Sequence, residues 1–265
     1  RYTVRFKPKN DKILNLRYEQ VIAKRILDSK AHYPKEYMKK ASHVCWSEKI
    51  KHDLMAEGIE EKNLPVTGDI KTDFSNHKFD SFFKTKEELA KEFNLDSNKE
   101  WILFISSFTF NEKDSKRLMS MNHNLDDGKY MQKWNVESKA IIMEWFEKFL
   151  KRHPDKEFIY RPHPVEFNVL DEDSTISILD EKYSNFHYIN KYAIQEWIRP
   201  CDYLNTVIST SIIDVYLLEK QCNILRPVEL NPDFDNPLLV GAKTINNYED
   251  FEKLNTHKNN GEFPV

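Results

Sequence analysis

Glycine is scarce in this sequence, with only five residues in 265, whereas an average usage of about 7% would give more than three times as many. Neither G-x-G-x-x-G nor G-x-x-x-x-G-K-[S/T] occurs. The glycine-rich turn of dinucleotide-binding proteins and the P-loop therefore have no support in this chain. Any phosphate bound here is expected to be held by side chains and the start of a helix.

Other features that are missing narrow the class of protein. Three cysteines, Cys45, Cys201 and Cys222, lack the spacing of a zinc site or a redox pair, so they are expected to be ordinary half-buried thiols. No apolar run approaches the roughly 20 residues that span a bilayer, and no secretory signal opens the chain, which favours a cytoplasmic protein. The formal net charge is −3, so no global field attracts nucleic acid or an anionic membrane.

Apolar periodicity divides the chain into three regions. Residues 1–75 form one piece of α/β structure, with strands expected at 2–6, 43–46 and 64–67 and helices at 17–29 and 48–57. Residues 76–100 are polar and charged, with one helical segment at 87–93, and are expected to be an interdomain crossing. The chain starts at Arg1 rather than methionine and has a short first region, which suggests a fragment, a processed chain or a trimmed one.

Residues 101–265 show a regular alternation of strands and helices. Such alternation is typical of a doubly wound, mostly parallel α/β sheet of the Rossmann type. The segment from Phe108 to Asn135 has no clear period, and it is expected either to contact an acceptor or to be a disordered insertion. The elements expected in this region are strands at 101–105, 158–160, 186–189, 203–208 and 223–225, and helices at 138–151, 194–198 and 212–220.

The segment Tyr160-Arg161-Pro162-His163-Pro164-Val165-Glu166 follows one expected strand. The two prolines fix φ and disfavour helix in the residue before each, so His163 is expected in a stiff, extended turn. The Arg161 guanidinium suits phosphate oxygens, and His163 can stabilise a departing phosphate. Glu166 either orients His163 or binds a ribose hydroxyl. The alternative is an ordinary ion pair for Arg161 and a hydrogen-bonded turn histidine.

Hydroxyl side chains gather where another expected strand leads into a helix, at Ser209-Thr210-Ser211. A phosphate at such a helix start would receive hydrogen bonds from backbone and side chains together. The local alternative is a capping box between Ser211 and Asp214. Both arrangements are compatible, because Ser211 can cap the helix while Ser209 and Thr210 face the ligand.

Ser106 and Ser107 follow the strand expected at 101–105, so by the same rule they either meet the phosphate or the transferred group, or are simple loop hydroxyls. No metal or other cofactor is expected, because the histidines show no spacing with carboxylates that would form a metal site. Asp69 and Asp73 are expected to cap turns or to solvate the linker. The histidines considered are His43, His52, His123 and His187.

Two stretches resemble a known family. Ala41-Ser42-His43-Val44-Cys45-Trp46-Ser47 and the later Val66-Thr67-Gly68-Asp69-Ile70-Lys71-Thr72-Asp73 resemble the end of the N-terminal domain in bacterial surface-polysaccharide glycosyltransferases of the GT-B fold. In that family the crossing reads V-T-G-x-P-K-x-D, and Ile70 stands here in place of the proline. The segments 161–166 and 209–214 resemble the C-terminal, donor-binding domain of the same group, which implies a donor domain at 101–265.

The resemblance implies two kinds of donor. CMP-sugar users, such as the Kdo transferases of capsule and lipopolysaccharide, have a similar His-Pro dipeptide and serine-rich helix start. By that likeness His163, Arg161 and residues 209–211 hold the donor phosphate while a sugar passes to a glycan or lipid-linked acceptor. CDP-glycerol and CDP-ribitol phosphotransferases share a similar Arg-x-His-Pro and a Ser-Ser-x-x-x-Asp pattern that Asp214 fits, and there the phosphate itself is transferred.

The short first region supports a further alternative, a nucleotide-binding module without turnover. The general base of such transferases usually lies in the N-terminal domain, and none can be named here. A lipid-linked acceptor leaves peripheral association with the membrane open, although no amphipathic helix is dense enough in Lys and Arg to act as an anchor.

Overall fold

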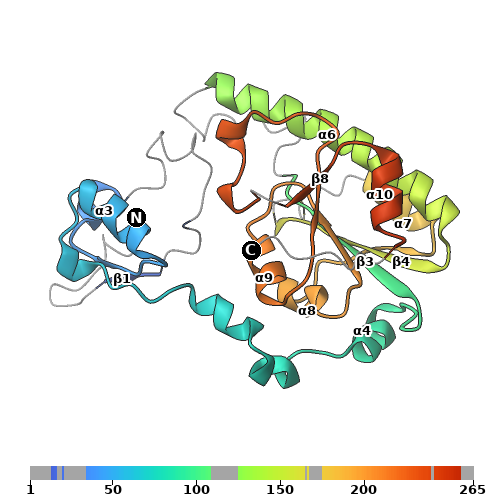
Figure 1. Ribbon diagram of the computed structural model, residues 1–265, viewed down its shortest axis with the longest axis horizontal. Coiled ribbons are helices and arrows are strands. Elements are labelled where there is room, and N and C mark those ends of the chain that lie inside the picture. The colour runs from blue at the N-terminus through green and yellow to red at the C-terminus, as the bar shows by residue number, and fades with distance from the viewer. Residues whose placement is uncertain are drawn as a thin grey trace. The chain divides into compact units, whose positions relative to one another are not determined.

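The computed structural model describes residues 13–16, 20, 34–108, 125–164, 166, 175–239 and 242–257. The strand expected at 2–6 and nearly all of the helix expected at 17–29 lie outside the described residues. The chain divides into two compact units, Arg1–Phe74 and Ser75–Val265, and Figure 1 labels many of their helices and strands. No helix in the described part of the chain is long and apolar enough to cross a membrane.

The first unit is built around a small parallel pairing. Strand β1 (Leu14–Asn15) pairs with β2 (Ser42–His43), and Cys45 forms a parallel bridge with Val66. The expected strands at 43–46 and 64–67 are thus reduced to short pairings. Helix α3 (Glu48–Ala56) is capped by Ser47, whose side chain accepts a hydrogen bond from the amide of Ile50. The remaining elements are the 3₁₀ turns η1 (Glu36–Met38) and η2 (Glu61–Asn63), and the core side chains are Cys45, Leu54, Ile59 and Leu64.

The second unit contains a six-stranded sheet with the order β5-β4-β3-β6-β7-β8, and all neighbouring strands are parallel. The chain starts at the centre with β3, moves outward through β4 to β5, and then returns to the other side of β3 with β6. This confirms the doubly wound parallel sheet expected from the sequence. The strands are β3 (Glu100–Ile105), β4 (Lys156–Arg161), β5 (Phe186–Tyr188), β6 (Tyr203–Thr206), β7 (Asn223–Leu225) and β8 (Lys243–Ile245).

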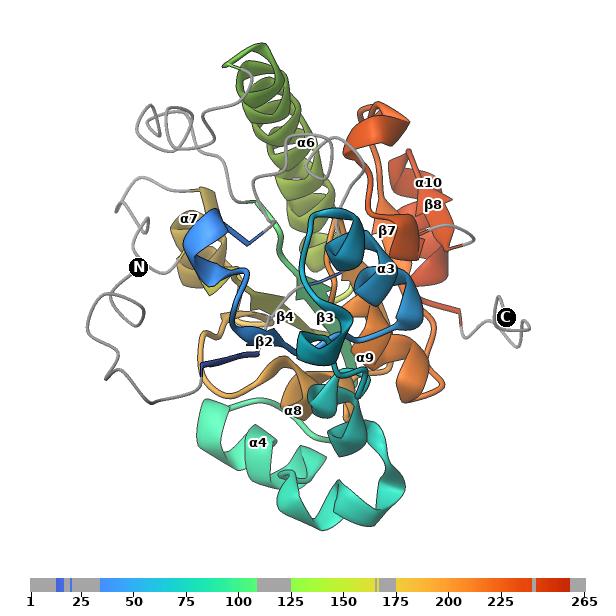
Figure 2. The same cartoon turned by 90° about the vertical axis from the view of Figure 1, so that its left-hand side faces the viewer.

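Helices cover both faces of this sheet (Figures 1 and 2). Alternate side chains of β3 serve the two faces: Phe104 packs with the α6 side, and Leu103 with the α8 side. The α6 face carries α6 (Leu125–Arg152), α7 (Thr175–Lys182) and α10 (Tyr248–Leu254), and the α8 face carries α4 (Lys86–Phe93), α8 (Ile194–Ile198) and α9 (Ile212–Leu217). Besides η1 and η2, the described residues form the 3₁₀ turns η3 (Ile70–Ser75), η4 (His77–Phe82), η6 (Pro232–Phe234) and η7 (Pro237–Leu239).

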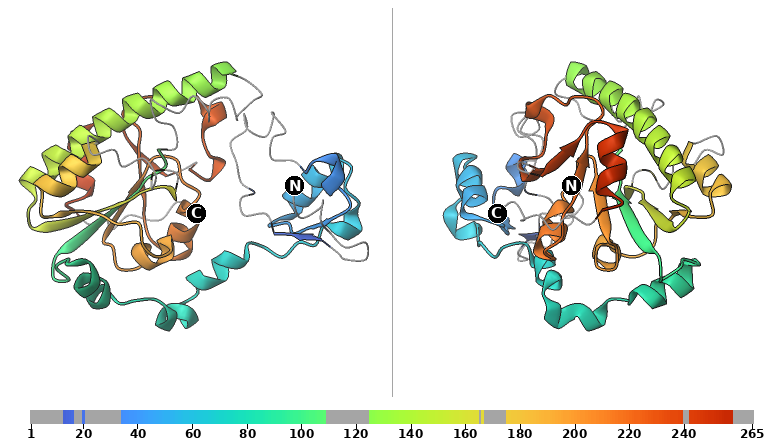
Figure 3. Two further views of the ribbon diagram at one scale, coloured as in Figure 1. Left: turned by 180° about the vertical axis from the view of Figure 1, so that it is seen from behind. Right: turned by 45° about the vertical axis from the view of Figure 1, so that its right-hand side comes forward.

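Helix α6 is much longer than expected. Figure 3 shows it lying along one face of the sheet, and it starts at Leu125 rather than near Ser138. The expectation of irregular structure was therefore wrong for residues 125–135, and residues 109–124 lie outside the described part. Tertiary contacts stabilise this first half: the Trp134 indole donates to the carbonyl of Val228 at 3.1 Å, and the Tyr130 and Phe234 rings pack 4.9 Å apart.

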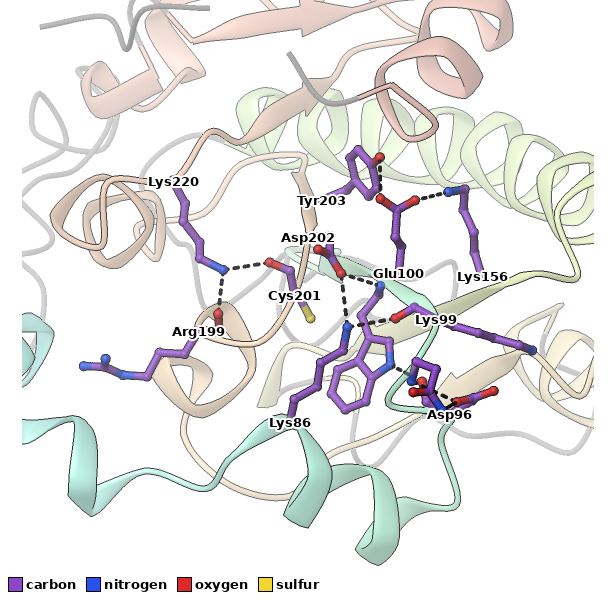
Figure 4. Close-up of polar contacts among 12 residues, drawn as sticks. Lys86, Asp96, Lys99, Glu100, Lys156, Arg199, Cys201, Asp202, Tyr203 and Lys220 are labelled. Carbon is purple, nitrogen blue, oxygen red and sulfur yellow. Dashed lines mark hydrogen bonds and ion pairs between the residues drawn. The ribbon is translucent and has the colours of Figure 1, made fainter. Parts of the chain in front are cut away.

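The amino ends of the strands are tied together by polar contacts (Figure 4). Asp202 Oδ2 accepts from the amide of Trp101 at 3.0 Å and lies 3.3 Å from the ammonium of Lys86. Lys220 donates to the carbonyls of Arg199 and Cys201 at 2.6 and 2.7 Å. These contacts hold the amino ends of β3 and β6 together.

The three cysteines are free thiols and are buried, more completely than the expected half-buried state. Burial raises the pKa of the Cys201 thiol to about 12. A thiol with so high a pKa stays protonated at neutral pH and packs as a small apolar group.

Candidate functional site

The sheet has one topological switch point, between the adjacent strands β3 and β6. Their last residues, Ile105 and Thr206, are register partners, so residues 106–108 and 207–211 leave the sheet side by side at its carboxyl edge. Open α/β sheets bind ligands in the crevice outside this point. The structure thus brings together the predicted serines after β3 with the predicted hydroxyl cluster after β6.

Ser107 links the two strand ends directly, because its hydroxyl oxygen accepts a hydrogen bond from the amide of Ile208 at 2.8 Å. Ser209 in turn accepts from the amide of Ser211 at 3.2 Å. A hydroxyl that accepts in this way keeps its own hydrogen for donation to another group. Ser107, Ser209 and Thr210 are half-buried, which places hydroxyl donors at the edge of the sheet without sealing them inside it.

The capping box considered as the local alternative for Ser211 and Asp214 is absent. Ser211 has a helical backbone (φ −63°, ψ −9°) and makes no capping hydrogen bond through its side chain, whereas a capping residue needs an extended backbone. Asp214 instead accepts from the side-chain amide of Gln195 on α8, at 2.8 Å. Asp214 therefore connects α9 to α8.

Glu166 fixes the turn that follows β4. Its carboxylate accepts from the buried Tyr160 hydroxyl at 2.8 Å and from the amide of His163 at 2.7 Å, while the Glu166 amide donates to the carbonyl of His163 at 2.7 Å. Only 7% of Glu166 is exposed. The Glu166 carboxylate thus holds the backbone of His163, whose side chain is half-buried.

Ser106 belongs to the same buried network rather than to the open edge. Its hydroxyl lies 3.0 Å from the Tyr160 hydroxyl and accepts from the amide of Phe108 at 3.3 Å. Its own amide donates to the carbonyl of Arg161 at 2.9 Å. Ser106 thus joins the end of β3 to the end of β4, and positions the neighbouring Ser107.

Arg161 is the last residue of β4, and its guanidinium donates to the carbonyl of Ile189, at 2.8 Å, and to that of Tyr192. Burial lowers the pKa of this guanidinium to about 10, which leaves it charged at neutral pH. The side chain thereby fixes the loop between β5 and α8. A contact with a phosphate would have to use the guanidinium hydrogens that these carbonyls leave over.

A second strand end repeats this arrangement and was not singled out from the sequence. Arg226 follows β7, is buried, and donates to the carbonyl of Val207 and to Asp235 Oδ1, the latter at 2.7 Å. The signal was present, because Arg226-Pro227 follows a strand just as Arg161-Pro162 does. Through Val207, Arg226 holds the start of the turn at 207–211.

Solved structures with the same architecture support this description of the fold. The wall teichoic acid polymerase TagF is 15% identical over 93% of this chain and 59% of its own, with a TM-score of 0.57. UDP-GlcNAc 2-epimerase from Methanocaldococcus jannaschii, in complex with UDP-GlcNAc and UDP, is 17% identical over 97% of this chain and 72% of its own, with a TM-score of 0.53.

A further solved structure is matched over a smaller share of its length. UDP-GlcNAc 2-epimerase from Neisseria meningitidis bound to UDP-GlcNAc is 16% identical over 80% of this chain and 51% of its own, with a TM-score of 0.47. This chain thus spans only about half of some of the chains that it matches. No family profile and no curated protein sequence matches it. At these identities the likeness defines the fold, which is α/β and GT-B-like, as the sequence predicted.

Proposed function

We propose that the chain is part of a transferase of bacterial surface-polysaccharide synthesis, which takes a sugar from a nucleotide-activated donor and passes it to a glycan or lipid-linked acceptor. One observation carries this proposal. Half-buried hydroxyls after β3 and β6 meet at the switch point of the sheet, beside a turn after β4 whose histidine backbone is held by a buried carboxylate. Hydrogen-bond donors held in this way suit a nucleotide phosphate.

In the proposed reaction an acceptor oxygen attacks the sugar carbon, and the bond between that carbon and the phosphate oxygen breaks. The departing nucleotide keeps the electron pair and gains negative charge. Ser107, Ser209, Thr210 and the His163 imidazole would donate to this phosphate. Because Glu166 fixes the turn before any ligand arrives, these donors cost little reorganisation when charge develops. We assign no general base in this chain.

A second candidate is a CDP-polyol phosphotransferase of teichoic-acid-like polymers. It is supported by the likeness in fold to the teichoic acid polymerase, at a TM-score of 0.57, together with the similar sequence pattern around His163. In that reaction the acceptor attacks phosphorus, and the polyol phosphate passes to the acceptor while CMP departs. The two candidates use the same crevice and differ in the bond that breaks, which is the bond from the sugar carbon to oxygen in the first and a phosphorus–oxygen bond of the diphosphate in the second.

The test is isothermal titration calorimetry of the chain with CMP, CDP, UDP, GDP and ADP, repeated with His163→Ala and, as a control, with the exposed His52→Ala. Selective binding of CMP supports a cytidine donor, because CMP departs from a CMP-sugar and from a CDP-polyol alike, and tighter binding of CDP than of CMP supports the polyol candidate. UDP or GDP selectivity supports an ordinary sugar transferase. Binding by none of the five, or binding that His163→Ala leaves unchanged, contradicts the assignment.

Transfer is measured separately, with the matching activated donor and an acceptor supplied. Release of the free nucleotide that depends on the acceptor supports a transferase. Nucleotide binding without any such release supports the remaining alternative, a binding module without turnover.

A further inference from the structure

A lysine of α6 reaches the carboxyl edge of the sheet near the proposed crevice. Lys139 Nζ lies 3.7 Å from Glu166 Oε1 and 5.8 Å from the centroid of the Phe108 ring. Phe108 follows β3 and Glu166 follows β4, so the ammonium lies beside the ends of two strands that form the edge. The side chain of Lys139 is 34% exposed, which leaves it in contact with solvent at this edge.

The contact with Glu166 holds this ammonium without using up its hydrogens. Glu166 already accepts close hydrogen bonds from the Tyr160 hydroxyl and the His163 amide. Its distance of 3.7 Å to Lys139 is an ion pair but exceeds the 2.7–3.2 Å of a usual N–H···O hydrogen bond. An ammonium has three N–H donors, so Lys139 can donate to an anion in the crevice while Glu166 keeps it there.

The arginines at the strand ends are less available. Arg161 donates to the carbonyls of Ile189 and Tyr192, and Arg226 donates to Val207 and pairs with Asp235. Their cationic groups are thus engaged in holding loops. Lys139 differs because its partner is itself satisfied by other donors.

An independent observation lies one helical turn before Lys139. Asn135 is 3% exposed, its side-chain nitrogen donates to the carbonyl of Met131 at 3.0 Å, and its side-chain oxygen has no hydrogen-bond partner within the described part of the chain. The hydroxyl of Ser138, on the next turn, is also buried and unpartnered there. A buried acceptor left unpaired is destabilising, and a ligand hydroxyl that donates to Asn135 would remove this penalty.

Residues four apart lie on the same side of a helix, which places Asn135 and Lys139 in one row along α6. This row offers a cation and, beside it, an acceptor for a hydroxyl. We propose that Lys139 binds the phosphate of the nucleotide-activated donor and that Asn135 accepts a hydroxyl of the same molecule. This inference rests on the function proposed above, and it adds a binding subsite on α6 to the residues that follow the strands.

The experiment measures the affinity of wild type, Lys139→Met and Lys139→Arg for whichever nucleotide of the panel the wild type binds best, at low and high salt. Lys133→Met is the matched control, because Lys133 lies on the same helix, is mostly exposed and pairs with Glu137. Lys139→Met is expected to weaken binding roughly ten- to hundredfold, the range for losing a charged hydrogen bond. Lys139→Arg and Lys133→Met are expected to bind as the wild type does.

Lys139→Met is also expected to make the affinity less dependent on salt, which a purely structural role would not do. Asn135→Ala should weaken binding by a smaller factor at both salt concentrations, because it removes a neutral hydrogen bond. Thermal unfolding of each variant confirms that it folds. If the wild type binds a nucleotide and Lys139→Met binds it equally well, the inference fails while the proposed function stands. If the wild type binds none of the five nucleotides, both fail.

Discussion

The buried hydroxyl of Tyr160 gives the most specific prediction about what holds the candidate site together. Tyr160 is fully buried, and its hydroxyl lies 2.8 Å from Glu166 Oε1 and 3.0 Å from Ser106 Oγ. Burial, and next the charge of Glu166, raise the pKa of Tyr160 well above its ordinary value, so the phenol is a neutral donor at pH 7. Tyr160→Phe removes this donor and leaves the ring in place.

The magnitude follows from what Glu166 then loses. A hydrogen bond to a charged group contributes about 1.5–3 kcal/mol, and leaving a buried carboxylate short of one donor costs a similar amount. Lys139, at 3.7 Å, is too distant to replace that donor without moving. We therefore expect Tyr160→Phe to lower the free energy of unfolding by about 2 kcal/mol. The turn at 161–166 should also loosen, and nucleotide affinity should fall with it.

The matched control is Tyr188→Phe. The rings of Tyr160 and Tyr188 stack with centroids 6.0 Å apart, yet the buried Tyr188 hydroxyl has no hydrogen-bond partner within the described residues. Removing that hydroxyl should change stability by no more than about 0.5 kcal/mol. Urea unfolding followed by tryptophan fluorescence compares the two variants. Equal stability losses for Tyr160→Phe and Tyr188→Phe would refute the role given to the hydroxyl of Tyr160.

Two further predictions concern the rest of the sheet. Burial on its own would raise the pKa of the Glu157 carboxyl, but the hydrogen bond with His187 helps to lower this pKa below its ordinary value. The carboxylate therefore stabilises the fold above about pH 4.5. This contribution is lost as the pH falls through the lowered pKa of the folded protein. Glu157→Gln should lower the melting temperature at pH 7 and should make the melting temperature fall less steeply below pH 4.5. An equally steep fall in the variant and the wild type would count against a stabilising interaction between Glu157 and His187. Asp202→Ala at the amino edge leaves the amide of Trp101 and the ammonium of Lys86 without this acceptor, and should cost about 1–3 kcal/mol of stability. Calorimetry should show unchanged nucleotide affinity for this variant, and a marked loss would mean that the ligand does not bind at the carboxyl edge.

The central strands could be predicted from sequence because they are apolar on both faces. Residues 101–105 form a run that is buried from both sides, and the short helix at 194–198 was predicted with the observed bounds. Strand β8 was missed because two of its three residues are exposed, and no apolar run marks it. The first half of α6 was missed because Gly128 and its polar neighbours predict a loop, whereas contacts of Trp134 with a segment far along the chain keep it helical.

For the candidate site, topology could be predicted but side-chain direction could not. Serines that follow parallel strands must gather at one edge of the sheet, and the structure brings Ser107 and the turn at 207–211 together in this way. Which partner a long side chain takes depends on tertiary distances. Arg161 finds the carbonyls of Ile189 and Tyr192, and Asp214 finds Gln195, and no local pattern in the sequence marks these pairs.

The measurement that tests the central claim most directly is the nucleotide titration followed by amide chemical shifts in isotope-labelled protein. If the ligand binds at the switch point, shifts will concentrate in residues 106–108, 163–166 and 207–211, and the amide of Trp101 at the amino edge will stay unchanged. Shifts that concentrate at the amino edge, or that spare the turns after β3 and β6, would contradict the account.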